Sequence, residues 1–122
     1  MNTGRPQLIE DPDMRAVLDF WLLQTGPDKW FSRDDALDAE IREKFSALHK
    51  RAAAGELAPW RGTPHGCLGE IIVLDQFSRN LYRDDPGAYA NDDQARETMT
   101  LALARDFDAG MSKDERWFLY MP

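Results

Sequence analysis

Cysteine is nearly absent from this sequence. The 122 residues include one, Cys67, and a single cysteine excludes an intramolecular disulfide. Cys67 falls on the apolar side of a predicted helix, where a free cysteine ordinarily serves as a small buried hydrophobic residue. A reactive thiol is the less favoured interpretation. This cysteine usage suits the cytosol, so we expect a cytoplasmic protein.

Long apolar runs and a positive charge balance are missing as well. No uninterrupted apolar run is longer than five residues, the run at residues 71–74 of the predicted central helix having four, and residues 1–14 lack the apolar stretch of a signal peptide. We therefore expect neither a membrane span nor export. Fifteen basic residues against 22 acidic ones give a formal charge of −7. Because that charge repels phosphates and anionic lipids, we expect no nucleic-acid or membrane partner.

Signatures of catalysis and of metal binding are also missing. The sequence contains no GxSxG turn, no Walker loop and no GxGxxG, so no motif assigns a nucleophile or a phosphate cradle. The two histidines, His49 and His65, stand in neither HExxH nor ExxH spacing, which zinc and di-iron sites on helices use. We expect no metal and no cofactor, and no residue is assigned a catalytic role.

What the sequence does contain is the material of one helical domain. Hydrophobic residues make up 43% of the chain, with four Trp and six Phe among them, which is enough for a single core at this length. Residues 1–10 show no periodicity and are predicted to form a loose arm before a domain at 11–122. Caps at Asp11, Ser32, Thr63, Asp92 and Ser112 open five segments with apolar residues three and four apart. The predicted helices are 11–25, 32–55, 63–83, 92–110 and a last one from 112 on.

The helix at residues 66–83, GCLGEIIVLDQFSRNLYR, organises the prediction because it has two faces. One arc is apolar, and Ile72 and Val73 lie in or beside the other, which predicts that the polar face is at least partly covered by protein. A hydrogen-bonding site on that face is the consequence. Its members are Asp75, Gln76, Arg79, Asn80 and Arg83.

Two interpretations of this polar face stay open. Asp75 and Arg79 are four residues apart and can pair, and the guanidinium of Arg79 or Arg83 could hold a carboxylate or phosphate through two parallel bonds. The competing and favoured interpretation is a satisfied buried network that locks the helix against its neighbours.

Four further residues are secondary candidates. Glu70 lies in the apolar arc, where a partner such as an arginine explains a carboxylate more readily than a general acid with a raised pKa. Trp60, near His65, is either an aromatic wall at the mouth of the polar face or a lid on the core. Asp38 and Arg42 are four residues apart, which is the spacing of a helical ion pair, and the surface interpretation is less favoured for them than for Glu40 and Lys44. Glu40 with Lys44 is predicted to be an ordinary surface pair.

The segment LDQFSRN, followed by Tyr82 and Arg83, resembles the signature of a bacterial family of uncharacterised proteins whose known members have a tetratricopeptide-like helical fold. The resemblance implies that fold and imports no catalytic residue. Ser78 stands where many members carry proline, so a kink there should be weaker. Further matches in order are Phe20–Trp21, Trp30–Phe31, Asp38 with Ile41 and Phe45, Gly55–Leu57 with Trp60, Thr63–Pro64, Tyr89–Ala90 with Asp92, and Tyr120–Pro122.

Members of that family run on past the Tyr-Met-Pro segment into further helices. We therefore expect this chain to be truncated relative to the family, with apolar surface uncovered by the missing helices. An exposed apolar patch of that kind is usually covered by a partner. A symmetric homodimer is the expected one.

The sequence predicts an all-α protein of about five antiparallel helices in a tetratricopeptide-like stack. The predicted function is a cytoplasmic binding or interaction module that recognises an anionic ligand or peptide through the polar face. The alternative is a small-molecule hydrolase or transferase, with Asp75 or Glu70 as acid–base and Arg79 holding an anion. A folded relic without a ligand is a third interpretation.

Overall fold

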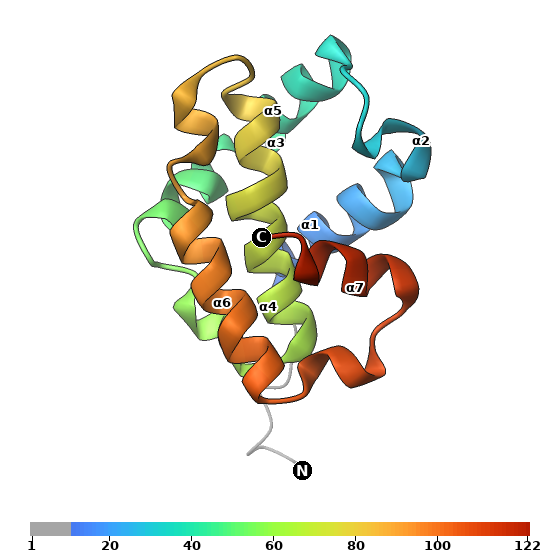
Figure 1. The fold of residues 1–122 in the computed structure, drawn as a ribbon. Coiled ribbons are helices and arrows are strands. Elements are labelled where there is room, and N and C mark those ends of the chain that lie inside the picture. Colours follow the sequence, from blue (N-terminus) through green and yellow to red (C-terminus); the bar gives the residue numbers. More distant parts are fainter. Residues whose placement is uncertain (1–10) are drawn as a thin grey trace.

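The computed structural model describes residues 11–122, and this part of the chain is helical with no strand (Figure 1). The predicted arm at residues 1–10 lies outside the described residues. The all-α class is confirmed, whereas the tetratricopeptide-like stacking stays a prediction. In chain order the elements are α1 (Pro12–Leu18), the π-helix η2 (Asp19–Thr25), α2 (Pro27–Trp30), α3 (Asp35–Ala53), the 3-10 helix η3 (Ala58–Gly62), α4 (Pro64–Ile71), the π-helix η4 (Ile72–Phe77), α5 (Ser78–Leu81), the 3-10 helix η5 (Pro86–Tyr89), α6 (Asp92–Ala104), the 3-10 helix η6 (Phe107–Gly110) and α7 (Lys113–Tyr120).

Several predicted helix ends are confirmed by their caps. Asp11 and Thr63 cap α1 and α4 through their side chains, with proline at the next residue, where a missing N–H removes no helical bond. Ser112 and Glu115 form the predicted capping box of α7. Gly55 follows α3 with a φ of +84°, a left-handed conformation that glycine adopts without strain.

Three predicted boundaries are wrong. The cap of α3 is Asp34 rather than Ser32, because the Asp34 carboxylate accepts a hydrogen bond from the backbone N–H of Leu37 at 3.0 Å. The helix expected at 92–110 ends at Ala104 and gives way to η6, and its cap is Asn91 rather than Asp92. Asp92 instead directs its carboxylate to an arginine of the central helix. Tertiary pairing thus overrides the local capping signal.

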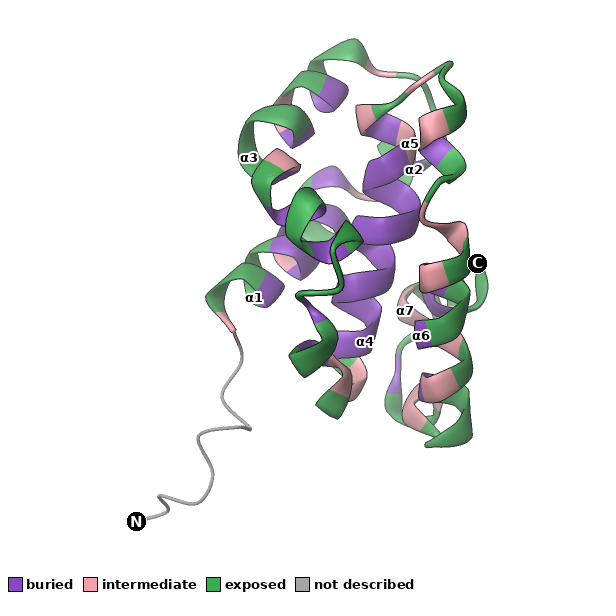
Figure 2. Ribbon diagram, turned by 90° about the vertical axis from the view of Figure 1, so that its left-hand side faces the viewer, coloured by how far each residue is buried: buried purple, intermediate pink, exposed green. Residues whose placement is uncertain are grey.

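The segments α4, η4 and α5 run on without a break and form the central rod of the domain. Figure 2 shows the middle of this rod, residues 66–78, as buried, and α1, α3, α6 and α7 pack around it (Figure 1). Ile72 and Val73 are fully buried, which confirms that the polar arc of the rod is covered by protein. Cys67 is also buried, as predicted, and burial raises the pKa of its thiol to about 11.

The middle of the rod is a π-helical turn, η4, which the sequence periodicity did not predict. Single π turns inside α-helices are often found at functional sites. Asp75 and Gln76 lie within this turn. Directly after it, the Ser78 hydroxyl donates to the Leu74 carbonyl oxygen at 2.6 Å and lies within hydrogen-bond distance of His49 Nε2, at 2.8 Å, so the end of the turn is tied to α3.

The start of the rod packs tightly against η3. A Cβ atom at Gly66 would overlap the carbonyl oxygen of Trp60, so glycine is required for this close approach. The Trp60 ring is buried and would contact a Cβ at Gly69, beside Met14. Trp60 is therefore a lid on the core. Within residues 11–122, no helix is long and apolar enough to span a membrane.

Candidate functional site

Glu70 is a fully buried carboxylate in the apolar arc of α4. Arg61 holds it through two parallel bonds, Nε to Oε1 at 2.8 Å and Nη2 to Oε2 at 3.0 Å, and the Thr98 hydroxyl adds a third bond at 3.1 Å. The remaining Arg61 nitrogen, Nη1, lies 3.8 Å from Glu97. The predicted arginine partner is confirmed, and it comes from η3. With no exposed surface, Glu70 has no route to a substrate.

Asp38 of α3 and the end of the rod form a second carboxylate–guanidinium pair. Arg83 donates from Nε at 2.6 Å and from Nη2 at 2.9 Å, and Asn80 donates at 2.8 Å. Burial alone would raise the pKa of Asp38, but the hydrogen bonds from Arg83 and Asn80 outweigh it and hold the pKa below its usual value. The predicted pairing of Asp38 with Arg42 is wrong, because Asp38 faces the rod.

Asp75 and Arg79 form the third pair, in the predicted spacing. Nη1 of Arg79 lies 3.0 Å from Asp75 Oδ1 and 3.3 Å from Asp92, and it donates to the Asp75 carbonyl oxygen at 2.8 Å. Gln76 donates to the other Asp75 oxygen at 2.7 Å and lies 3.0 Å from the sulfur of Met121. Burial raises the pKa of Asp75 above its usual value, against the attraction of Arg79.

Both arginines at the end of the rod keep unused donors. Every hydrogen bond of Arg79 with residues 11–122 comes from Nη1, so its Nε and Nη2 donate to no protein acceptor there. Arg83 likewise leaves Nη1 unused within the described chain. The guanidinium of Arg79 also lies 5.2 Å from the ring centroid of Tyr89, in cation–π range.

These two arginines line one cavity of about 480 Å³, which we call the arginine cavity. Its wall also contains the exposed ring of Tyr89. Asp84 and Asp85 supply negative charge: Asp84 pairs with Arg33 at 2.9 Å and Asp85 accepts from the backbone N–H of Gly87 at 2.7 Å. The full lining is Arg79, Arg83, Asp84, Asp85, Pro86, Ala88 and Tyr89.

The five predicted polar residues are thus brought together as two adjacent hydrogen-bonded clusters, and two of them reach the arginine cavity. Trp60 and His65 lie elsewhere; His65 contacts Glu115 of α7 at 2.9 Å. Sequence reasoning missed Tyr89 and Asp92 as partners of Arg79. The helical spacing of the rod carries no information about residues that follow a loop. In the described chain, no three side chains of the metal-ligating types gather.

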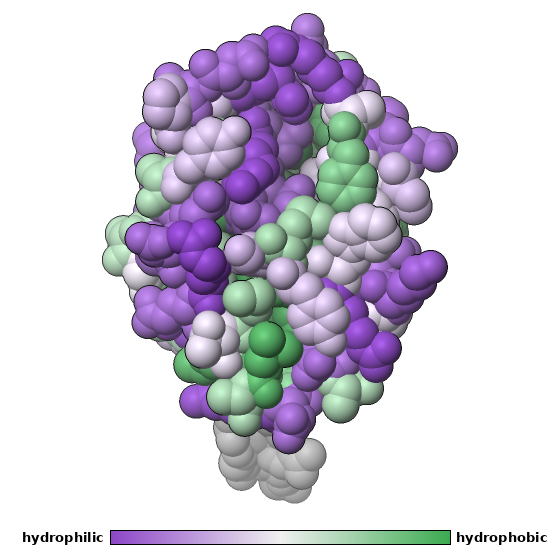
Figure 3. Space-filling view, in the orientation of Figure 1, coloured by the Kyte–Doolittle hydropathy of each residue, from purple (hydrophilic) through white to green (hydrophobic). Residues whose placement is uncertain are grey.

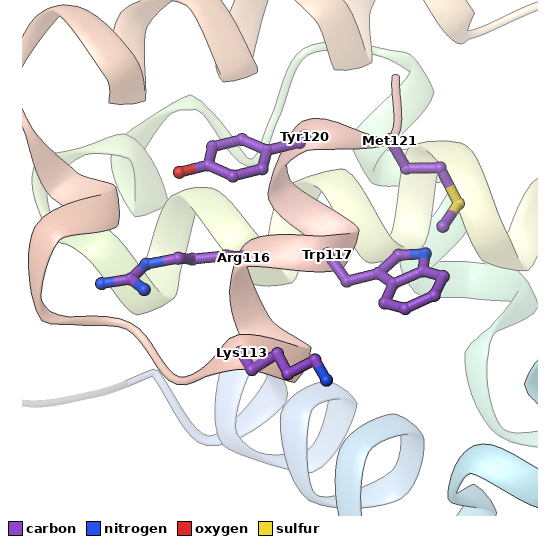
Figure 4. Close-up of a pocket in the computed structure, with 5 residues that line it drawn as sticks. All are labelled: Lys113, Arg116, Trp117, Tyr120 and Met121. Carbon is purple, nitrogen blue, oxygen red and sulfur yellow. The ribbon is translucent and has the colours of Figure 1, made fainter.

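A second hollow, of about 470 Å³, lies on the outer side of α7. Figure 4 shows four of its lining residues on α7 and the fifth, Met121, directly after it, with Trp117 and Met121 on one side and Arg116 and Tyr120 on the other. Figure 3 shows apolar side chains on the face that carries α7. Phe31 extends this surface, with its ring centroid 6.0 Å from that of Trp117.

Comparison with known sequences decides the family. Residues 17–122 match the family described as bacterial proteins of unknown function, DUF924. The chain belongs to this family. No curated protein matches it. The solved structure of a protein of unknown function from Agrobacterium tumefaciens is similar to this chain. The two sequences are 38% identical and the structures superpose with a TM-score of 0.85, over 89% of this chain.

The match to the Agrobacterium protein covers 61% of that longer chain. The DUF924 chain described here therefore spans about three fifths of its solved relative. Neither comparison assigns a ligand, a reaction or a partner. What the arginine cavity does has to be inferred from its chemistry.

Proposed function

We propose that this DUF924 chain is a cytoplasmic binding module that recognises a small ligand bearing a carboxylate or phosphate in the arginine cavity. The observation that carries the proposal is the set of unused guanidinium donors of Arg79 and Arg83 on one cavity wall. A guanidinium binds such anions through charge-assisted bonds of fixed geometry. The Tyr89 ring offers an apolar surface for the rest of the ligand.

The buried carboxylates support the same proposal. Asp38 holds one edge of the Arg83 guanidinium through Nε and Nη2, and Asp75 holds Nη1 of Arg79, so the remaining donors are oriented before a ligand arrives. A preoriented donor loses little conformational entropy on binding. The cavity volume of about 480 Å³ suits a small molecule rather than a folded partner.

Isothermal titration with 3-phenylpropionate and the singly charged diester methyl phenyl phosphate tests the proposal, with neutral 3-phenylpropanol as the reference ligand. We expect both anions to bind more tightly than the alcohol. Arg79→Lys should weaken anion binding about tenfold, which is about 1.4 kcal/mol, because lysine can replace Nη1 beside Asp75 but lacks the fork. The matched control is Arg51→Lys, since Arg51 is an arginine paired with Asp13 and Glu56 outside the cavity.

Equal binding of the anions and the alcohol would contradict the proposal, as would an equal loss in the Arg51 control. The rival function, a hydrolase or transferase with Asp75 as acid–base, draws support from the raised pKa of that carboxyl. Asp75 is buried and does not line the cavity, so binding is the function that the geometry favours.

The outer side of α7 supports a separate proposal, a symmetric dimer with a second copy of this chain. Exposed fractions are 60% for Phe31, 51% for Trp117, 48% for Tyr120 and 37% for Met121. At about 200 Å² for a large side chain, these residues expose roughly 400 Å² in each copy. Two copies would bury roughly 800 Å² of apolar surface, and a polar rim brings this to the lower range of specific interfaces.

Sedimentation equilibrium between 1 and 100 μM measures this association. We expect a weak dimer that Trp117→Glu abolishes, because aromatic residues at the centre of an interface dominate its energy. Leu23→Glu is the matched control, since Leu23 is also apolar and exposed but lies outside this surface. A monomer at 100 μM, or equal loss in both variants, would contradict the dimer.

A further inference from the structure

The arginine cavity has charged groups of both signs, and in the described chain these groups form no direct ion pair with one another. Among the described residues, neither Asp84 nor Asp85 lies within 4 Å of a guanidinium nitrogen of Arg79 or Arg83, although all four line the same cavity. Each aspartate has one oxygen engaged, with Arg33 or with the N–H of Gly87. Within residues 11–122, no hydrogen bond engages the second oxygen of either carboxylate, so it can accept another bond.

The backbone holds this arrangement in place. Asp84 has a φ of +63°, a left-handed conformation that costs energy in a residue with a side chain. Arg33 fixes its carboxylate, and the backbone N–H of Asp85 donates to the Tyr82 carbonyl oxygen at 3.0 Å. The turn therefore presents two carboxylates directly after the residue, Arg83, that presents a guanidinium.

The charge balance of the cavity disfavours a multiply charged anion. Two arginines and two aspartates line it, and each guanidinium already faces a buried carboxylate, Asp38 or Asp75. A dianion would add to a local excess of negative charge in a chain of formal charge −7. A ligand with one negative and one positive group satisfies both sets of free atoms.

We infer that the ligand is a zwitterion of the amino-acid type, and this rests on the proposed function. Its carboxylate binds the free donors of Arg79 and Arg83, its ammonium group binds the free oxygens of Asp84 and Asp85, and its apolar group packs on Tyr89. Charged hydrogen bonds at both ends would give specificity as well as affinity. The cavity is large enough for an aromatic amino acid.

Three probes separate the two ends of the ligand in isothermal titration. L-Phenylalanine has both charged groups, 3-phenylpropionate has the carboxylate alone and 2-phenylethylamine has the ammonium alone. We expect phenylalanine to bind about tenfold more tightly than either of the others. In the double variant Asp84→Asn/Asp85→Asn, phenylalanine should fall to the affinity of 3-phenylpropionate, whose own affinity should not fall.

The asparagines are chosen to preserve the turn. Asparagine tolerates a left-handed backbone, and its amide oxygen can still accept from Gly87. The control is Asp35→Asn/Asp93→Asn, which removes two exposed aspartates outside the cavity; Asp35, like Asp84, is a partner of Arg33. The control should bind phenylalanine as the unchanged chain does.

The possible outcomes distinguish a failure of the zwitterion inference from a failure of the proposed function. If 3-phenylpropionate binds and phenylalanine binds no more tightly, the zwitterion is wrong and anion recognition stands. If neither binds, or if 2-phenylethylamine binds most tightly, the proposed function fails together with the inference. An equal loss in the control variant would show a general charge effect and would also overturn the zwitterion.

Discussion

Two carboxylate–guanidinium systems on the same central rod differ in how much of the arginine they use. At the start of the rod, all three nitrogens of Arg61 face a carboxylate, Glu70 or Glu97, and its side chain is 19% exposed. At the end of the rod, Arg79 contacts described residues through one nitrogen and is 37% exposed. The same residue types thus make a sealed structural pair at one end and a partly open pair at the other.

The comparison shows that neither the residue types nor the burial of the carboxylate distinguishes a structural ion pair from a candidate binding site in this protein. Glu70 and Asp75 are both buried. What differs is whether the arginine has donors left and a cavity in front of them. A series of substitutions along the rod measures this contrast.

Arg61→Ala should have the largest effect on stability. It leaves the Glu70 carboxylate buried without its charged partner, which typically costs about 3–5 kcal/mol. The free energy of unfolding from urea denaturation at pH 7 measures the loss. A loss below about 1 kcal/mol would contradict the sealed pair.

Asp38→Ala should rank second, with a loss of about 2–3 kcal/mol. The substitution removes an acceptor that Asn80 and Arg83 share. The Arg83 side chain left unpaired is 26% exposed and can recover hydration, whereas the Glu70 side chain left by Arg61→Ala is fully buried and cannot. The same urea titration compares the two variants directly. If Asp38→Ala lowered the free energy of unfolding more than Arg61→Ala does, the expectation that the sealed Arg61–Glu70 pair contributes more than the partly open Asp38–Arg83 pair would be wrong.

The pH dependence of Asp38→Asn and Asp75→Asn should have opposite signs. The pKa of Asp38 is lowered in the folded chain, so its contribution is full above the usual value near 3.8 and is lost as the pH falls through the lower folded pKa. The pKa of Asp75 is raised by burial, so its contribution is full below 3.8 and is lost as the pH rises through the higher folded pKa.

Urea unfolding between pH 2.5 and 7 measures how the stability contributions of Asp38 and Asp75 change with pH. The stability difference between the unchanged chain and Asp38→Asn should grow as the pH rises, whereas the difference from Asp75→Asn should shrink. Parallel curves for the two variants would contradict the contrast between the clusters.

Lys44→Ala should have the smallest effect, about 0.3–0.5 kcal/mol. Lys44 pairs with Glu40 at 2.7 Å on the exposed side of α3, as the spacing predicted. Exposed pairs of this kind contribute little and are screened by salt. Thermal unfolding at low and high salt measures the loss of stability in Lys44→Ala. A loss comparable to that of Asp38→Ala would refute the distinction between surface and buried pairs.

The sequence was sufficient for the helical class, the burial of the polar face and the Asp75–Arg79 pair. Each of these follows from residues close together in the chain: apolar spacing sets helices, and a separation of four residues sets pairs. The arginine partner of Glu70 was predictable in kind, because a buried carboxylate needs a cation. The sequence did not predict that Arg61 is the arginine that pairs with Glu70.

The site itself depends on contacts between distant segments. Asp38 and Arg83 are 45 residues apart, and the local spacing pointed to Arg42 instead. Asp92 looked like a helix cap because a cap and an ion-pair partner require the same side chain. The π turn of η4 also stayed hidden, since one extra residue per turn leaves no separate mark in a short apolar pattern.

Nuclear magnetic resonance of the arginine side chains tests the contrast most directly. Titration with 3-phenylpropionate, followed through the assigned Nε–H signals, reports on Arg79 and Arg61 in one experiment. The account predicts a saturable shift at Arg79, with Arg61 unchanged because its nitrogens are already engaged. No shift at Arg79, or equal shifts at both arginines, would contradict it.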